Sequence, residues 1–372
     1  MNIMINCSNL RVGGGIQVAD SICRELYKYS KCRFIVVYPK VLADSARAIE
    51  TYDNVKTVFY EMPMNVRTIL FSQNSFLDSL VEKESIKGVL TVFGPSRWRP
   101  QVYHLCGFAR SQLVIPESPF WDSLSMVWRL KYAVRKRLMR NAFGKCSDAF
   151  WTESKFISDR VEKMYPWAKV YTATNNCNQV FDDDTKWDRS IRLPDFEGLT
   201  LLTISANYPH KNLPIVIPTI HVLKRKYPNL KFRFVLTLKE EQFPRLTEIE
   251  KKHVEFVGPV KVEQCPNLYK QSDVMFLPTL LECFSASYAE AMKMRVPILT
   301  TDLSFAHGLC GEAALYYEAM NPESLADSIW LLANDERLKS RLVIEGVNQL
   351  DNYDTYQERA RKLIEILCEE SK

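Results

Sequence analysis

Short apolar runs alternate with helix-length segments along the chain. In the first half, runs typical of strands lie at residues 2–7, 34–38, 89–93 and 149–152. The first run leads into Gly13, Gly14 and Gly15, after which apolar residues recur at helical spacing as far as residue 29. Alternation of this kind is typical of βαβ units, so we expect a parallel sheet.

The alternation stops at residues 175–196, which carry polar and acidic clusters and no apolar period, and then restarts. Further strands are predicted at 199–204, 232–238, 254–257, 273–277, 297–300 and 313–317, with helices over 213–227 and from Asn321-Pro322 onward. We therefore expect an α/β chain with an N-terminal domain over 1–174, a linker over 175–196 and a C-terminal domain over 197–350. Residues 351–372 are predicted as a final helix that packs back on the N-terminal domain.

Composition narrows the class of protein. The chain has 372 residues, of which 47% are apolar and 25% charged, as in an ordinary soluble globular protein. The net charge of +5 is too small to predict nucleic-acid binding by the surface as a whole. Because the sequence has no long apolar window, no signal-peptide pattern and no Cys-x-x-Cys pair, we expect a cytoplasmic protein with free thiols.

The densest chemical signal is the segment 278–292, which runs from the end of a predicted strand into a helix. The amides of residues 284–287 would lie at that helix N-terminus, where unpaired N–H groups and the helix dipole favour a phosphate. Glu282 and Glu290 flank the helix start and would accept hydrogen bonds from hydroxyls of an attached sugar or ribose. Ser287 and Glu290 also have the spacing of a capping box, in which Glu290 would only cap the helix.

Several motifs occur together in the C-terminal half. They are Glu282-x7-Glu290 followed by Ala291-Met292, the strand 296–300, the segments 256–260 and 268–274, and the stretch 311–315 before the Asn321-Pro322 helix. Together with the glycines at 13–15, this combination resembles the retaining family 4 glycosyltransferases. Such enzymes have the GT-B fold, in which two Rossmann-like domains face each other across a cleft. The resemblance covers residues 199–332 well and the N-terminal half loosely.

The resemblance implies roles for residues of the C-terminal domain. Glu290 would bind the nucleotide ribose, and Glu282 would contact the donor sugar. The diphosphate would be held by three backbone amides, those of Phe284, Ser285 and Ala286. Lys211 matches the lysine that neutralises the leaving diphosphate, although a solvated lysine is the alternative reading, and Val257 and Gly258 belong to a loop that would shape the donor pocket.

In the N-terminal domain, the resemblance places Gly14 and Gly15 near the donor phosphates, where the lack of a side chain permits close approach. His104 matches a histidine close to the donor sugar. From the residues alone, the glycines also suit a plain tight turn, and His104 equally suits a core or surface position.

The sequence departs from the family pattern at one cation. Many members carry an arginine five residues before the lysine, where this chain has Ala206. No Asp-x-Asp lies at a predicted strand end, so neither a divalent metal nor another cofactor is expected. Lys211 and the positive helix end would then stabilise the leaving group.

The positive excess of the chain lies in residues 124–146, which contain seven Lys or Arg and no Asp or Glu. On a helix the aliphatic positions form a stripe that we expect to face the core, namely Val127, Leu130, Val134 and Leu138. Arg129, Lys136 and Arg140 lie opposite and, with aromatic residues on the flank, could rest on an anionic membrane surface. A solvated basic face and RNA binding are the alternatives.

Together with these residues, the resemblance implies a metal-independent glycosyltransferase of the hexosyltransferase type (EC 2.4). It would move a sugar from a nucleotide diphosphate sugar to a saccharide hydroxyl, and the resemblance implies retention at the anomeric carbon. If the basic helix binds the inner face of the membrane, the acceptor would be a lipid-linked saccharide, as in capsule or O-antigen assembly. The alternatives are a sugar-nucleotide epimerase or phosphorylase of the same fold, and a non-catalytic protein that binds sugar nucleotides or polyanions.

Overall fold

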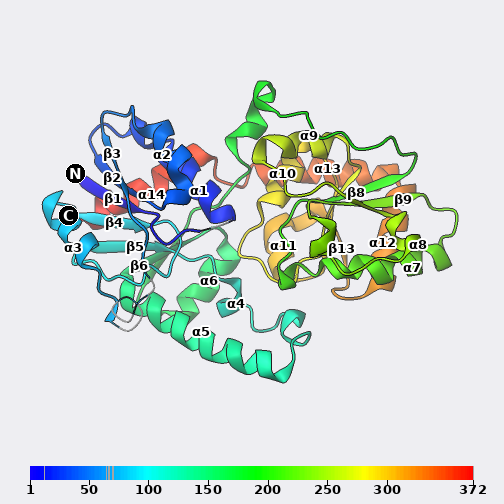
Figure 1. The fold of residues 1–372 in the computed structure, drawn as a ribbon, viewed down its shortest axis with the longest axis horizontal. Helices are drawn as coiled ribbons and strands as arrows, with labels where there is room; N and C mark the ends of the chain where they lie inside the picture. Colours follow the sequence, from blue (N-terminus) through cyan, green and yellow to red (C-terminus); the bar gives the residue numbers. More distant parts are fainter. Residues whose placement is uncertain (12, 64, 66–67, 69–70, 372) are drawn as a thin grey trace. The chain divides into compact units, whose positions relative to one another are not determined.

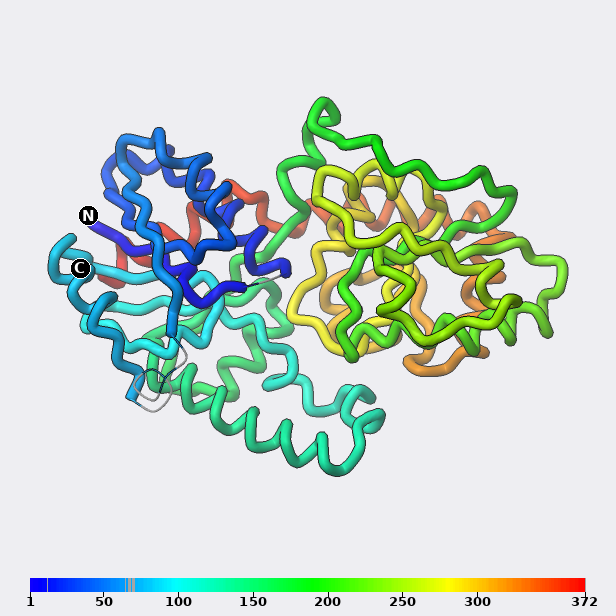
Figure 2. The backbone as a smooth tube through the Cα atoms, viewed as in Figure 1, coloured from blue at the N-terminus to red at the C-terminus, as the bar shows by residue number. Residues whose placement is uncertain are grey.

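The chain divides into two α/β units. The computed structural model describes residues 1–11, 13–63, 65, 68 and 71–371. Unit 1 consists of Met1–Pro116, Ser125–Asn175 and Asp354–Lys372, and unit 2 of Glu117–Leu124 and Asn176–Tyr353. Figure 1 shows a sheet within each unit, and Figure 2 traces the backbone of the same chain.

Unit 1 is built on a sheet of seven parallel strands, in the order β3-β2-β1-β4-β5-β6-β7. Their bounds are β1 Asn2–Asn6, β2 Arg33–Tyr38, β3 Val55–Phe59, β4 Gly88–Thr91, β5 Tyr103–Gly107, β6 Ala149–Thr152 and β7 Lys169–Thr172. β1, β2, β4 and β6 match apolar runs of the sequence. Since β1, β2 and β4 are almost completely buried, their side chains are apolar on both faces.

Seven α-helices cover this sheet or extend from it: α1 Gly14–Cys23, α2 Ala43–Ile49, α3 Ser75–Lys83, α4 Ser111–Val114, α5 Met126–Cys146, α6 Lys155–Met164 and α14 Tyr356–Glu370, counted over the described residues. The last of these comes from the end of the chain. α14 contributes Leu363, Ile364 and Leu367 to the core beneath α1, so unit 1 is completed by residues that follow unit 2 in the sequence.

Unit 2 has a sheet of six parallel strands in the order β10-β9-β8-β11-β12-β13. The strands are β8 Leu199–Thr203, β9 Phe232–Leu236, β10 Val254–Phe256, β11 Val274–Leu277, β12 Ile298–Thr301 and β13 Ala314–Tyr317. The helices are α7 Val216–Lys226, α8 Glu248–Lys251, α9 Cys265–Lys270, α10 Ala286–Met294, α11 Ser304–Cys310, α12 Pro322–Asn334 and α13 Glu336–Leu350. Both sheets have the doubly wound strand order of Rossmann folds, which bind ligands at the carboxyl ends of their strands.

From Asn176 onward, the stretch predicted as a linker is part of unit 2. It contains two short 3-10 helices, η5 Gln179–Asp182 and η6 Asp184–Lys186. Val180 and Phe181 are buried there in the core that α9 and α10 share. A second extra piece of unit 2 is the segment 117–124, which contains η4 Pro119–Trp121.

The basic helix α5 turns the opposite face to the protein from the one the sequence pattern predicted. The aliphatic stripe of Val127, Leu130, Val134 and Leu138 is exposed, not core-facing. Phe143 is fully buried instead and packs against Phe108 and Phe150, with ring centroids 4.7 and 6.1 Å apart. A large aromatic side chain buries more apolar area than a branched aliphatic one, and the C-terminal end of α5 is anchored through it.

Candidate functional site

Two loops of unit 2 meet after neighbouring parallel strands, one after β8 and one after β11. The first holds the 3-10 helix η7 Pro209–Lys211, and the second leads into α10. The ammonium group of Lys211 forms an ion pair with Oε1 of Glu282, and their side chains are only 13% and 10% exposed. The hydroxyl of Thr279 donates to the same oxygen of Glu282 at 2.9 Å. The candidate leaving-group lysine and the candidate sugar-binding carboxylate are therefore in direct contact.

Glu290 lies one turn into α10 and is buried. The hydroxyl of Tyr269, on α9, donates to Oε2 of Glu290 at 3.0 Å. Burial raises the pKa of Glu290 to about 7, and the hydrogen bond from Tyr269 opposes that rise. The capping-box alternative is wrong, because the N-cap is Ser285 and the hydroxyl of Ser287 donates to the carbonyl of Ile204.

The N-terminus of α10 provides backbone donors between these acidic groups. The side chain of Ser285 makes no capping hydrogen bond to the first amides of the helix. Phe284, Ser285 and Ala286 lie at this helix start, as the sequence predicted, and the positive end of the helix dipole lies with them. A phosphate group could accept hydrogen bonds from these amides.

His210 stands beside Lys211 and contacts the segment 117–124. Its ring lies edge-on to Phe120 at 6.3 Å and is stacked on Tyr208 at 5.7 Å. Burial lowers the pKa of His210, which favours the neutral form of its ring. The hydroxyl of Ser118 donates to the carbonyl of Leu280 at 2.6 Å, which ties this segment to the loop after β11.

Val257 and Gly258 follow β10 at the same edge of the sheet. Their amides donate to the carbonyls of Leu236 and Leu238, at 3.1 and 3.0 Å. Gly258 has a φ of 74°, and an added Cβ would meet no other atom within 4 Å. The conformation therefore favours glycine for its backbone and not for lack of space.

Three candidate residues lie in unit 1. Gly14 and Gly15 begin α1 after β1, the position at which Rossmann-type units approach phosphates. The expected position of His104 near the donor sugar is wrong, since His104 is fully buried on β5. Both of its ring nitrogens are engaged, one with the carbonyl of Cys146 and the other with the hydroxyl of Thr91 at 2.7 Å. Burial lowers the pKa of His104 to about 4, so it is a neutral core residue.

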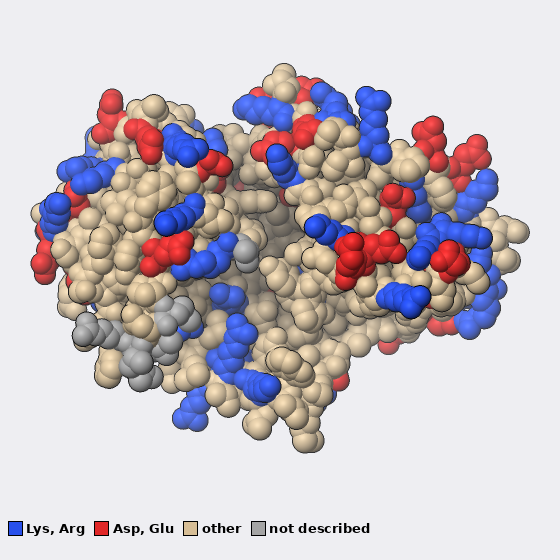
Figure 3. Space-filling model, in the orientation of Figure 1, with Lys and Arg blue, Asp and Glu red and all other residues tan. Residues whose placement is uncertain are grey.

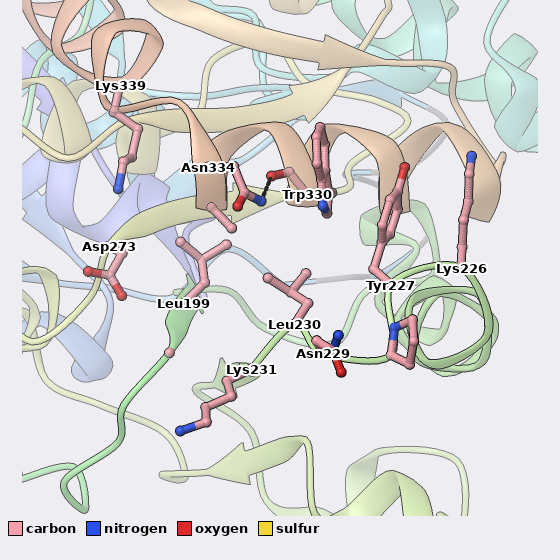
Figure 4. A pocket seen from close by; sticks show the side chains of 13 residues that line it. Leu199, Lys226, Tyr227, Asn229, Leu230, Lys231, Asp273, Trp330, Asn334 and Lys339 are labelled. Carbon is pink, nitrogen blue, oxygen red and sulfur yellow. Dashed lines mark hydrogen bonds between the residues drawn. The ribbon is translucent and has the colours of Figure 1, made fainter.

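A cavity of about 580 Å³ lies at the other end of the unit 2 sheet (Figure 4). Its lining includes Leu199, Lys231 and Asp273, which begin or precede β8, β9 and β11. Figure 4 also shows Trp330 and Asn334 above it on α12. Because parallel sheets bind ligands at the carboxyl ends of their strands, this cavity at the amino ends is not the donor site.

Sequence reasoning missed the supporting roles of Thr279 and Tyr269, which hold the two key carboxylates. Tyr269 belongs to the 268–274 motif, so its position was visible while its partner was not. Among the described residues, no group of three or more His, Cys, Asp or Glu side chains could hold a metal ion. Over the same part of the chain, no helix combines the length and the apolar character needed to span a bilayer.

Solved structures share the fold of this chain. Two Rossmann-like units with doubly wound parallel sheets make up the GT-B fold. Sucrose-phosphate synthase from Thermosynechococcus elongatus superposes with a TM-score of 0.70 at 12% identity, over 99% of this chain and 98% of that one. The Anabaena protein HepE, solved in complex with UDP and glucose, gives a TM-score of 0.65 at 12% identity, over 98% and 99%.

Within unit 2, residues 198–335 match the model of the family described as glycosyl transferases group 1. The O-antigen chain mannosyltransferase RfbU of Salmonella typhimurium is 21% identical over 272 residues, which is 71% of this chain and 70% of that protein. The gpi3 subunit of phosphatidylinositol N-acetylglucosaminyltransferase from Schizosaccharomyces pombe is 22% identical over 202 residues. That match covers 52% of this chain and 43% of the gpi3 subunit, so the chain spans less than half of that relative.

Proposed function

We propose that this protein is a retaining, metal-independent glycosyltransferase that uses a nucleoside diphosphate sugar as donor and a saccharide hydroxyl as acceptor. The observation that carries the proposal is the gathering of Lys211, Glu282 and the α10 N-terminus at the carboxyl ends of parallel strands. Glu290, one turn further along the helix, completes a site for an anion with hydroxyl groups on either side of it. The UDP and glucose bound by HepE, which shares the fold, support this class of donor.

In the proposed reaction, the bond between the anomeric carbon and the phosphate oxygen breaks, and a bond to the acceptor oxygen forms on the same face of the sugar. The proton of the acceptor hydroxyl passes to the departing phosphate. Lys211 would leave Glu282 and turn to the diphosphate as negative charge develops there. Glu282, released from Lys211, would accept hydrogen bonds from the donor sugar and orient it without attacking it.

We also propose the class of acceptor and the location of the protein in the cell. The sugar-transferring relatives named above include an enzyme of O-antigen chains and one of a phosphatidylinositol acceptor. They support a saccharide or lipid-linked saccharide as acceptor, in cell-surface polysaccharide assembly. We place the protein in the cytoplasm, where nucleotide sugars are available, at the inner face of the membrane.

Nucleotide binding can be tested with a thermal-shift panel of UDP, GDP, ADP and CDP, with and without a chelator. At about 100 times its dissociation constant, the correct nucleotide should add about 2.7 kcal/mol to the stability of the folded protein. The shift should survive the chelator and should be lost in Glu290→Gln. Glu250→Gln is the matched control, since Glu250 is also buried in unit 2 but caps α8.

The reaction itself is tested with the donor that this panel selects. A transferase should release nucleoside diphosphate in proportion to a glycoside whose anomeric configuration, read by proton NMR, matches that of the donor. An inverted product would contradict the retaining mechanism. Conversion of the donor without transfer would favour an epimerase, and binding without turnover over a broad acceptor panel would favour a non-catalytic protein.

A further inference from the structure

The exposed face of α5 carries an apolar ridge with positively charged side chains on both sides of it. At 3.6 residues per turn, four aliphatic side chains lie within about 80° of one another around the helix. With Met126 they form the α5 ridge, which consists of Met126, Val127, Leu130, Val134 and Leu138. These five side chains are between 56% and 85% exposed. Burial of such side chains against an apolar phase would be strongly favourable, yet nothing among the described residues covers them.

Cations border the α5 ridge on both sides. Helical geometry places Arg137 along one border and Lys131 and Arg135 along the other, whereas Arg129 and Arg140 lie on the opposite face. Residues 126–146 contain no Asp or Glu. Figure 3 accordingly shows blue and tan atoms, with almost no red, over the place that α5 occupies in Figure 1.

We propose that α5 docks unit 1 on an anionic lipid bilayer, with the α5 ridge inserted between headgroups and the bordering Arg and Lys side chains paired with lipid phosphates or carboxylates. Long cationic side chains beside an apolar stripe are the arrangement of helices that lie in the plane of a membrane interface. The face that inserts is therefore the aliphatic one, not the opposite face with Lys136 and the flanking aromatic residues.

Other occupants fit these observations less well. A nucleic acid would use the cations and leave the α5 ridge in water. In a symmetric dimer formed through this face, two helices with seven cations each and no acid would repel one another. An anionic bilayer would bury the α5 ridge in its apolar phase and pair the bordering cations with lipid anions.

The test is co-sedimentation of the full chain with vesicles of equimolar phosphatidylserine and phosphatidylcholine, compared with vesicles of phosphatidylcholine alone. The wild type should sediment with the anionic vesicles only. Leu130→Ser/Val134→Ser should lower partitioning at least about tenfold, because two buried aliphatic contacts are lost. Arg137→Glu should lower it by a similar factor through charge.

The controls keep these outcomes distinct. Ile344→Ser and Arg341→Glu alter exposed residues on α13 of unit 2 and should leave vesicle binding unchanged. All variants should keep the wild-type circular dichroism and nucleotide thermal shift, so a failed donor site and a failed membrane contact are told apart. Absence of binding to anionic vesicles would overturn the proposal. The proposal would also be overturned if Leu130→Ser/Val134→Ser bound vesicles normally while Arg137→Glu did not, because the cations alone would then account for binding. Competition by polyuridylate RNA would strengthen that conclusion.

Discussion

Glu290 is buried, whereas the ribose contact proposed for it would favour an ionised carboxylate. Its pKa of about 7, against 4.5 for an ordinary glutamate, means that the folded protein binds this proton more tightly than the unfolded chain does. The contribution of Glu290 to stability therefore falls as pH rises from about 4.5 to 7 and stays low above that. Glu290→Gln should stabilise the nucleotide-free protein at pH 8, by up to about 3 kcal/mol, and have little effect at pH 4. Urea unfolding at the two pH values measures this difference.

Glu250→Gln should behave in the opposite way. The amide of Thr247 donates to the carboxylate of Glu250 and lowers its pKa, so removal of this charge should destabilise the protein at pH 8.

Hydrogen bonds from ribose hydroxyls would favour the ionised form of Glu290, and we expect nucleotide affinity to weaken as pH falls below about 7. A nucleotide affinity that is flat between pH 5 and 8 would speak against contact between Glu290 and the ribose.

Lys211 is the residue on which the proposed chemistry depends most. Lys211→Met keeps the length of the side chain and removes the charge that faces Glu282. We expect kcat to fall about 10²–10³-fold, the usual loss when one electrostatic stabiliser of a transition state is removed. Steady-state release of nucleoside diphosphate measures this effect, with exposed Lys224→Met as the matched control. A fall in stability without a fall in kcat would assign Lys211 a structural role.

At the scale of single residues, the sequence predicted candidate site residues but not the side chains that contact them. Glu282, Glu290 and Lys211 were found from their spacing and from family resemblance, and the structure brings Lys211 and Glu282 into contact. The prediction that His104 lies near the donor sugar was wrong, because no local sequence pattern reveals that Cys146 and Thr91 bond both of its ring nitrogens. Such partners lie far away in the sequence and meet only through the sheet.

At the scale of single elements, the residue that ends α10 can be replaced to increase the stability of the protein. The helix ends at Arg295, whose φ of 58° is in the left-handed region, and its amide donates to the carbonyls of Ala291 and Met292. Glycine adopts this conformation without strain, so Arg295→Gly should stabilise the protein by about 0.5–1 kcal/mol after its greater unfolded-state entropy is counted. Arg295→Ala should give no such gain, because it keeps the Cβ. The midpoint of urea unfolding distinguishes the two variants.

Strands buried on both faces were the easiest elements to predict. β1, β2 and β8 are continuous apolar runs, whereas β3 and β7 are half-exposed edge strands with polar residues in alternation and were not predicted. The buried strand β5 was not predicted either, since His104 and Gly107 interrupt its apolar run. α5 shows a further limit. Periodicity located its aliphatic stripe correctly, but which side of a helix is covered depends on what the rest of the chain places there.

At the scale of the whole molecule, each unit has a core of its own. Unit 1 depends on Arg359 of α14, which is buried and bonded to Asn175 and to the hydroxyl of Ser21 at 2.9 Å. Burial lowers the pKa of Arg359 to about 10. Since Asn175 also binds Glu153 at 2.7 Å, removal of Arg359 would leave buried polar groups without their partner.

We therefore expect Arg359→Leu to destabilise unit 1 by about 3–5 kcal/mol. Arg361→Leu, on the same helix but exposed, should cost less than about 1 kcal/mol. In calorimetry, Arg359→Leu should lower the transition temperature of unit 1. A bound nucleotide should raise the transition temperature of unit 2. A single transition that moves as a whole in both experiments would contradict independent stability of the two cores.

The return of α14 to unit 1 has a consequence for synthesis on the ribosome. Domains commonly fold in the order in which they are made. Here the residues of unit 2 up to Tyr353 have all been joined before Leu363, Ile364 and Leu367 can fill the core beneath α1. The first unit to be started is therefore the last to be closed, and its unfinished core has to be kept from aggregation while almost the entire chain is being translated.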